Sequence, residues 1–133
     1  MSDQIAFVPV DSLRHIEGFS SKRVEWLREK IEREQVWTKP LALDRTHHLV
    51  MDGQHRMEVA RALDLAVVPA VLFDYSDVEV WSLRPKYEFS WETVVQRSIA
   101  NDPYPYKTVK HGFPVDLPNC SVPLDQLRRN PAT

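Results

Sequence analysis

The sequence has few of the features that mark secreted, membrane or nucleic-acid-binding proteins. Its 133 residues include a single cysteine, Cys120, which has no partner for an internal disulfide. No apolar stretch is long enough for a signal peptide or a membrane span. No run of lysine or arginine has the density of a nucleic-acid-binding arm, and the formal net charge is −2. We therefore expect a cytoplasmic protein in a reducing compartment, with no membrane partner and no general affinity for nucleic acid.

Two kinds of site are disfavoured by residue order. Cys120 lies between Pro118 and Pro123 with no base nearby in sequence, and a free cysteine is usually a small buried hydrophobe. His47 and His48 are adjacent, so in a strand they point to opposite faces, and no further histidine or cysteine lies at ligand spacing. The sequence predicts neither a catalytic cysteine nor a structural zinc site.

The length is suited to one domain, which we expect to span residues 1–133 without internal repeats. Apolar periodicity and turn residues predict a strand, a helix, a two-stranded hairpin, a helix, two strands and a helix. The expected ranges are 5–10, 22–34, 41–44 with 48–51, from 53, 67–73, 78–83 and from 90. Pro9 marks the first strand as an edge strand, and Ser20 or Ser21 caps the first helix.

The last third of the chain is less regular. The helix from Ser90 carries an apolar stripe in which we assign Trp91 to the core rather than to a ligand, together with Val94, Val95 and Ile99. Arg84-Pro85 breaks the strand before it. From Asp102 the chain becomes rich in proline and polar residues, which is typical both of an ordered functional loop and of a loose tail, and periodicity does not choose between them.

The most informative segment is 50–56, in which a strand-like run ends in a glycine turn that opens into a helical pattern. The first N–H groups of a helix are unpaired and favour an anion, and His55 and Arg56 add side-chain donors there. Asp52, just before Gly53, is suited to orient a hydroxyl, a ribose or a divalent metal. The plainer interpretation is that Asp52 caps the helix while His55 and Arg56 are solvated.

Two other groups have the chemistry that phosphoryl transfer needs, which is cations on the phosphates and a carboxylate at the attacking hydroxyl. Glu17 lies among Ile16, Gly18 and Phe19, where partly apolar surroundings would raise its pKa, although most glutamates are simply solvated. A second set of donors is suited to a carboxylate or phosphate on a small substrate, or forms a basic solvated loop: Lys107, Thr108, Lys110 and His111.

Taken in order, these pieces resemble the ParB/sulfiredoxin-like superfamily and, within it, the free L-serine kinases. The resemblance covers most of the chain and implies an α+β fold, a small mixed β-sheet with packed helices. Residues 102–133 would form a proline-rich loop and C-terminal segment that complete the site. The segments that carry the resemblance are Glu17 six residues before Arg23, the helix 23–27, the turn 50–56, the strand 68–75, Arg84-Pro85 and the segment 105–111.

The resemblance implies transfer of a phosphoryl group from ATP or ADP, with Mg²⁺, to the hydroxyl of free L-serine or a similar hydroxy amino acid, which gives O-phosphoserine. Glu17 would be the base, with Asp52 and His55 as further catalytic residues and Asp52 at the metal. The nucleotide phosphates would be held by Gly53, Gln54, His55 and Arg56. The substrate carboxylate or the product phosphate would be bound by Lys107, Thr108, Lys110 and His111.

The sequence departs from the kinase pattern at a few positions. Gln54 stands where the kinases usually carry histidine, Val109 stands where a second hydroxyl residue is frequent, and Trp81 is close to the family's tryptophan but out of register. A ParB-like nucleotide-binding module that regulates DNA or a protein partner is the alternative, although no helix-turn-helix region is appended. Sulfiredoxin-type repair needs a cysteine in the 52–56 turn, where this chain has Gln54, and is set aside.

Overall fold

The computed structural model describes residues 5–84 and 90–128 of the chain. Its helices and strands follow one another as β1 (Ala6–Pro9), the 3-10 helix η1 (Val10–Ser12), α1 (Ser21–Glu34), β2 (Val36–Trp37), β3 (Leu41–Asp44), β4 (Val50–Asp52), α2 (Gln54–Ala62), β5 (Val67–Phe73), the 3-10 helix η2 (Tyr75–Asp77), β6 (Glu79–Ser82), α3 (Trp91–Ile99), β7 (Val109–Gly112), β8 (Val122–Pro123) and α4 (Leu124–Leu127).

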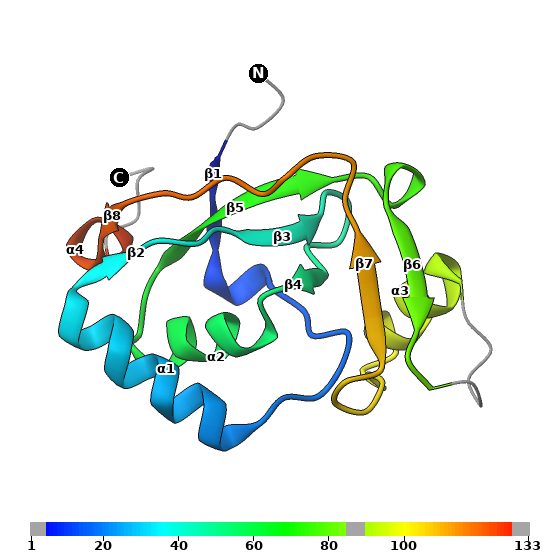
Figure 1. The fold of residues 1–133 in the computed structure, drawn as a ribbon, viewed down its shortest axis with the longest axis horizontal. Helices are drawn as coiled ribbons and strands as arrows, with labels where there is room; N and C mark the ends of the chain where they lie inside the picture. Colours follow the sequence, from blue (N-terminus) through cyan, green and yellow to red (C-terminus); the bar gives the residue numbers. More distant parts are fainter. Residues whose placement is uncertain (1–4, 85–89, 129–133) are drawn as a thin grey trace.

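The main sheet is mixed, as predicted, and Figure 1 shows it at the centre of the molecule. Its four strands run in the order β1-β5-β3-β4, with β3 parallel to β5 and the other pairs antiparallel. β3 and β4 form the predicted hairpin, and β1 is an edge strand, which is where Pro9 is tolerated. The hairpin brings the end of β4 directly to the start of α2.

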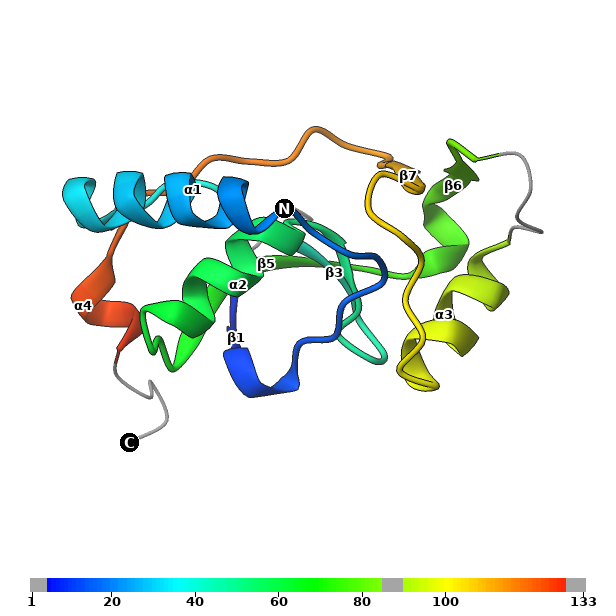
Figure 2. The same ribbon diagram turned by 90° about the horizontal axis from the view of Figure 1, so that it is seen from below.

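Helices α1 and α2 pack against each other beside this sheet (Figures 1 and 2). The Oγ of Ser20 accepts a hydrogen bond from the Arg23 N–H at 3.3 Å, so the predicted cap of α1 is confirmed. The apolar face of α1 meets the core through Val24, Leu27 and Ile31. This packing fixes the N-terminal ends of α1 and α2 relative to β4.

Two apolar cores lie on either side of the sheet because successive strand residues point to opposite faces. Leu41 and Leu43 of β3 belong to the core that α1, α2 and α4 cover, whereas Ala42 belongs to the second core. The second core also includes Val94 of α3 and Val109 of β7. The β6–β7 pair and α3 therefore form a separate wall at one end of the sheet (Figure 1).

Some elements differ from the prediction. The pair β2–β8 was not predicted, since each strand has only two residues. The segment 109–112 is an ordered strand paired with β6 rather than a loop. Trp91 is 42% exposed, so its assignment to the core is wrong, although its ring stacks on Tyr75. The predicted break at Pro85 lies outside the described residues.

Two further observations concern Cys120 and the lengths of the helices. The Cys120 thiol donates to the Trp37 carbonyl at 3.3 Å, and burial raises the pKa of this thiol, which disfavours the reactive thiolate. Within the part of the chain that the structure describes, no helix combines the length and the apolar character that a bilayer crossing requires.

Candidate functional site

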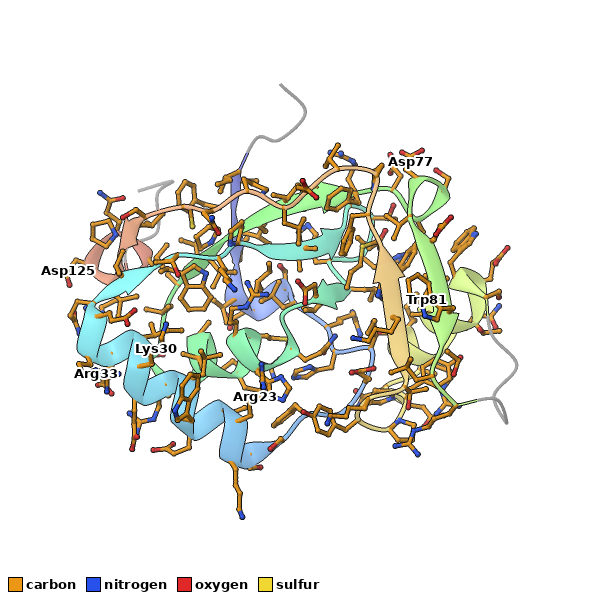
Figure 3. All side chains as sticks on the ribbon, in the orientation of Figure 1. Arg23, Lys30, Arg33, Asp77, Trp81 and Asp125 are labelled. Carbon is orange, nitrogen blue, oxygen red and sulfur yellow. The ribbon has the colours of Figure 1, made fainter. Side chains whose placement is uncertain are left out.

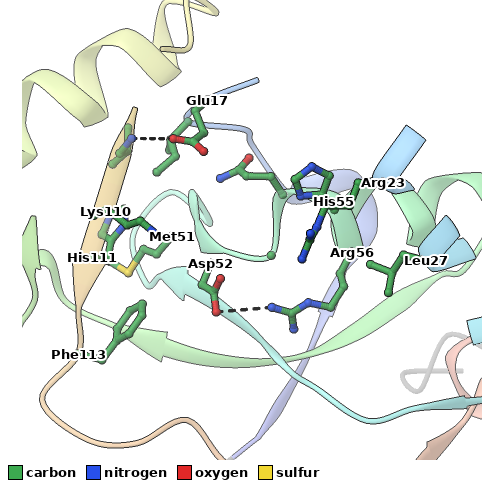
Figure 4. A pocket seen from close by; sticks show the side chains of 14 residues that line it. Glu17, Arg23, Leu27, Met51, Asp52, His55, Arg56, Lys110, His111 and Phe113 are labelled. Atoms are coloured by element: carbon green, nitrogen blue, oxygen red, sulfur yellow. Dashed lines mark hydrogen bonds and ion pairs between the residues drawn. The ribbon is translucent and has the colours of Figure 1, made fainter. Parts of the chain in front are cut away.

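A cavity of about 370 Å³ lies where three segments meet (Figure 4). The first segment is the Glu17 loop with the start of α1, the second runs from the end of β4 into α2, and the third is β7 with the residues that follow it. All three segments were singled out in the sequence as separate groups. The fold therefore brings the predicted base, the 52–56 turn and part of the late basic segment around one space.

The turn between β4 and α2 depends on Gly53. Its φ of 118° and ψ of 30° lie in the left-handed region, which side chains rarely adopt. A Cβ at this position would collide with the Leu41 side chain and lie 3.2 Å from Nη2 of Arg56. Gly53 is the N-cap of α2, and no side chain caps the helix, which excludes Asp52 as a conventional cap. The first N–H groups of α2 are therefore available to an anion at the cavity.

Glu17 is held by the backbone of β7 and of the residue before it. Its Oε1 accepts hydrogen bonds from the N–H groups of Val109 at 2.7 Å and Thr108 at 3.2 Å. Burial raises the pKa of Glu17, although these backbone bonds and the charge of Lys110 oppose the rise. The arrangement gives a fixed carboxylate with raised basicity at the cavity wall.

His55 occupies the first turn of α2 as a neutral ring. Its Nε2 accepts a hydrogen bond from the Ser20 N–H at 3.0 Å, so the ring proton is on Nδ1. Burial lowers the pKa of His55, and the nearby charges of Arg23, His15 and Arg56 lower it further. His55 can therefore offer an N–H to an anion, while its other nitrogen is occupied by the backbone.

The Arg56 side chain stabilises the turn between β4 and α2. Its Nη1 donates to the carbonyls of Lys39 and Pro40, each at 2.8 Å, and its Nη2 lies 3.5 Å from Oδ2 of Asp52. The Arg56 side chain is only 16% exposed, whereas Asp52 is 53% exposed at the same cavity. Part of the guanidinium is thus committed to the fold, and the Asp52 carboxylate is open to a ligand.

The surroundings of Asp52 suit one mode of Mg²⁺ coordination. Among the described residues no three His, Cys, Asp or Glu side chains cluster in a way that could hold a metal ion. Mg²⁺ in phosphoryl-transfer sites is commonly bound by one or two carboxylates together with substrate phosphates and water. The single exposed carboxylate of Asp52, beside the uncapped N-terminus of α2, fits that arrangement.

Gln54 lines the cavity but is only 7% exposed, and its side-chain amide is bonded to the protein. Its amide nitrogen donates to the Val50 carbonyl, and its Oε1 lies 2.5 Å from Nδ1 of His15. The other nitrogen of His15 lies 2.6 Å from Oε2 of Glu58. The predicted contact of Gln54 with phosphate is therefore possible through its backbone N–H, while its side chain ties the Glu17 loop to β4 and α2.

Replacing Gln54 by leucine should destabilise the fold, because it removes the side-chain partner of the Val50 carbonyl and of Nδ1 of His15. We expect a loss of about 2–3 kcal/mol in the free energy of unfolding, measured by urea titration. Gln96→Leu, on the exposed side of α3, is the matched control and should change stability little. Equal stability of the two variants would contradict this role for Gln54.

The late basic segment is only partly brought to the cavity. Lys110 and His111 line it. Thr108 is fully buried, its Oγ1 donates to the Pro105 carbonyl at 2.6 Å, and its contribution to the site is the N–H that Glu17 accepts. Lys107 is exposed outside the cavity, with its ammonium 5.4 Å from the centre of the Tyr106 ring.

Burial lowers the pKa of His111 to about 4, against an ordinary value of 6.5. Between these two values the unfolded chain binds more protons than the folded one, so stability is complete above about pH 6.5 and falls as the pH drops toward 4. We expect this histidine to account for a loss of about 2–3 kcal/mol between about pH 7.5 and about pH 4.5. Urea titrations at both pH values should show that this part of the loss disappears in His111→Asn; an undiminished loss would contradict it.

Sequence reasoning missed Arg23 as a residue of the site. It lies in the first turn of α1, one turn from the Ser20 cap, and reaches toward α2 at the cavity (Figures 3 and 4). Its charge contributes to the lowered pKa of His55. The signal available in the sequence was its position six residues after Glu17. Trp81, by contrast, pairs with Lys110 across β6 and β7 and is 46% exposed.

These features define the chain first as an α+β protein of the ParB/sulfiredoxin-like fold, with a cavity at which the uncapped N-terminus of α2 lies beside a half-buried carboxylate. Among solved structures, a free serine kinase in complex with AMP matches with a TM-score of 0.85 and 15% sequence identity, over 92% of this chain and 93% of that one. A glutamate-to-alanine variant of a free serine kinase in complex with ADP matches with a TM-score of 0.85 and 14% identity, over the same shares of the two chains.

SbnI from Staphylococcus aureus, with a C-terminal truncation, matches with a TM-score of 0.84 and 13% identity, over 95% of this chain and 90% of that one. No protein-family model and no curated protein matches the sequence. At identities this low the likeness establishes the fold, and the predicted fold class is confirmed.

Proposed function

We propose that the protein is a small-molecule kinase that transfers a phosphoryl group from ATP or ADP to the hydroxyl of free L-serine. The observation that carries the proposal is the convergence on one cavity of Glu17, the open N-terminus of α2 and Lys110. The solved free serine kinases of the same fold, which are in complex with AMP or ADP, support nucleotide binding. A carboxylate, a phosphate-binding helix end and cations are the parts that phosphoryl transfer needs.

In the proposed reaction Glu17 takes the proton of the serine hydroxyl. The serine Oγ forms a bond to the terminal phosphorus as the bond from that phosphorus to the leaving nucleotide oxygen breaks. The products are O-phosphoserine and the nucleotide shortened by one phosphate. Because the backbone N–H groups of Thr108 and Val109 fix Oε1 of Glu17, the carboxylate needs little reorganisation before it accepts the proton.

The N–H groups at the start of α2 hold the nucleotide phosphates, assisted by Nδ1–H of His55 and the Arg23 guanidinium, which line the same cavity. Asp52 would hold Mg²⁺, which when bound neutralises charge on the phosphate oxygens. Lys110 and His111, on the opposite wall, bind the carboxylate of the amino acid or the phosphate of the product.

The test is to incubate the protein with Mg²⁺ and either ATP or ADP, and with L-serine, D-serine, L-threonine or L-homoserine, and to measure phosphorylated amino acid by mass spectrometry. We expect O-phosphoserine with L-serine. Nucleotide binding without product from any acceptor would overturn the proposal and favour the nucleotide-binding regulatory module.

A further inference from the structure

One ring nitrogen of His111 has no hydrogen-bond partner among the described residues. The ring lines the cavity, yet its Nδ1 is buried and makes no hydrogen bond to any described residue. The other nitrogen, Nε2, lies 3.0 Å from the Tyr75 hydroxyl. Buried polar atoms in proteins are nearly always paired, so an unpaired one on a cavity wall calls for an explanation.

Counting donors and acceptors assigns the proton. If the Tyr75 hydroxyl donates to Nε2, the ring proton is on Nδ1, and one N–H is left without an acceptor. If Nε2–H donates to the hydroxyl instead, both the Tyr75 O–H and the bare Nδ1 lose their partners. The first arrangement leaves fewer buried groups unsatisfied and is therefore more stable.

The surroundings of Tyr75 and His111 keep both groups in the required form. Burial, together with the charge of Asp44, raises the pKa of Tyr75, so the hydroxyl retains its proton. The lowered pKa of His111 keeps its ring neutral near pH 7. Trp91 of α3 stacks on the Tyr75 ring at 6.1 Å between ring centres and 12° between planes, and Phe113 stacks on His111 at 6.1 Å and 12°.

We propose that Tyr75 is a positioning residue that holds His111 with its proton on Nδ1, so that this N–H serves an oxygen of the bound substrate. The inference rests on the proposed function, in which His111 faces the amino acid or its phosphate. Nδ1 is closed off from solvent, so a carboxylate or phosphate oxygen in the cavity reaches this N–H only when the ring turns toward it. Trp91, stacked on the Tyr75 ring, holds that ring in place.

The test is the protonation of the His111 ring, read by long-range ¹⁵N–¹H NMR near pH 7. His111→Asn assigns its signals among the five histidines of the chain. We expect the proton on Nδ1 in the wild type and a shift toward Nε2–H in Tyr75→Phe, which lacks the donor. Tyr104→Phe is the matched control, because it removes a buried hydroxyl that bonds to Thr93 at 3.2 Å instead, and it should leave the His111 signals unchanged.

Two further readouts separate this inference from the proposed function. O-phospho-L-serine added to the wild type should shift the Nδ1–H signal, and Tyr75→Phe should raise the KM for L-serine about tenfold with a smaller change in kcat. A wild-type proton on Nε2, or a Tyr75→Phe ring identical to the wild type, would overturn the inference. The expected NMR changes without any kinase product would support Tyr75 as the positioning residue and count against the proposed reaction instead.

Discussion

Replacing Glu17 by glutamine should lower kcat for serine phosphorylation by about a hundredfold to ten-thousandfold, the usual contribution of a general base. Glutamine keeps the shape of the side chain and an oxygen that can accept from the N–H groups of Thr108 and Val109. It cannot accept the serine proton. The loss should therefore appear in kcat, measured by coupled assay, while the Kd for nucleotide, measured by calorimetry, stays nearly unchanged.

The pH dependence gives a second signature of the same residue. Burial raises the pKa of Glu17 above the ordinary carboxyl value of 4.5, and only the deprotonated form is a base. Activity should rise with pH through this raised pKa and then level off, and the rise should be absent from the residual activity of Glu17→Gln. The control is Glu29→Gln on the exposed side of α1. Wild-type kcat in Glu17→Gln would contradict the assignment of the base.

Gly53→Ala should have the largest effect on the architecture of the site. An alanine at a φ of 118° is strained, and its Cβ would collide with Leu41. We expect a loss of about 2–4 kcal/mol in the free energy of unfolding, or about 10 °C in Tm, from backbone strain and overpacking. Since the same turn directs the first N–H groups of α2, nucleotide affinity should fall by at least about tenfold in the fraction that folds.

Gly18→Ala is the control for this loss of stability. A Cβ at Gly18 would lie 3.4 Å from the Tyr106 nitrogen, an ordinary contact, so its stability should change by no more than about 1 kcal/mol. The measurements are thermal unfolding and calorimetric titration with ADP. A Gly53→Ala protein as stable as Gly18→Ala, with unchanged affinity for ADP, would show that the turn does not need a glycine.

The parts of the fold that the sequence predicted are those with strong local signals. α1 has a serine cap and an apolar face at helical spacing, and the β4–Gly53–α2 unit combines a strand, a glycine turn and a helix within a few residues. β7 was missed because Lys110 and His111 hide its alternation and because its partner, β6, lies about thirty residues earlier in the chain. Non-local pairing of this kind leaves no trace in a short window of sequence.

The sequence indicated which segments lie at the candidate site, but not where each side chain points. Glu17, the 52–56 turn, Lys110 and His111 all line the cavity, whereas their chemical roles stay predictions. The Thr108 hydroxyl donates to the Pro105 carbonyl beside a backbone bend at Lys107, whose φ is 60°. No residue pattern in the sequence indicates this bend. Likewise, the role of Gln54 depends on His15, which lies 39 positions away in sequence.

The central claim is that this one cavity carries out phosphoryl transfer to serine. The most direct test is a single turnover, with the protein in excess over Mg²⁺-bound ATP or ADP and with saturating L-serine, followed by ³¹P NMR. The account predicts that each nucleotide consumed yields one O-phosphoserine, and that Glu17→Gln gives none on the same timescale. Nucleotide that binds and remains intact, or that is hydrolysed to inorganic phosphate without O-phosphoserine, would contradict it.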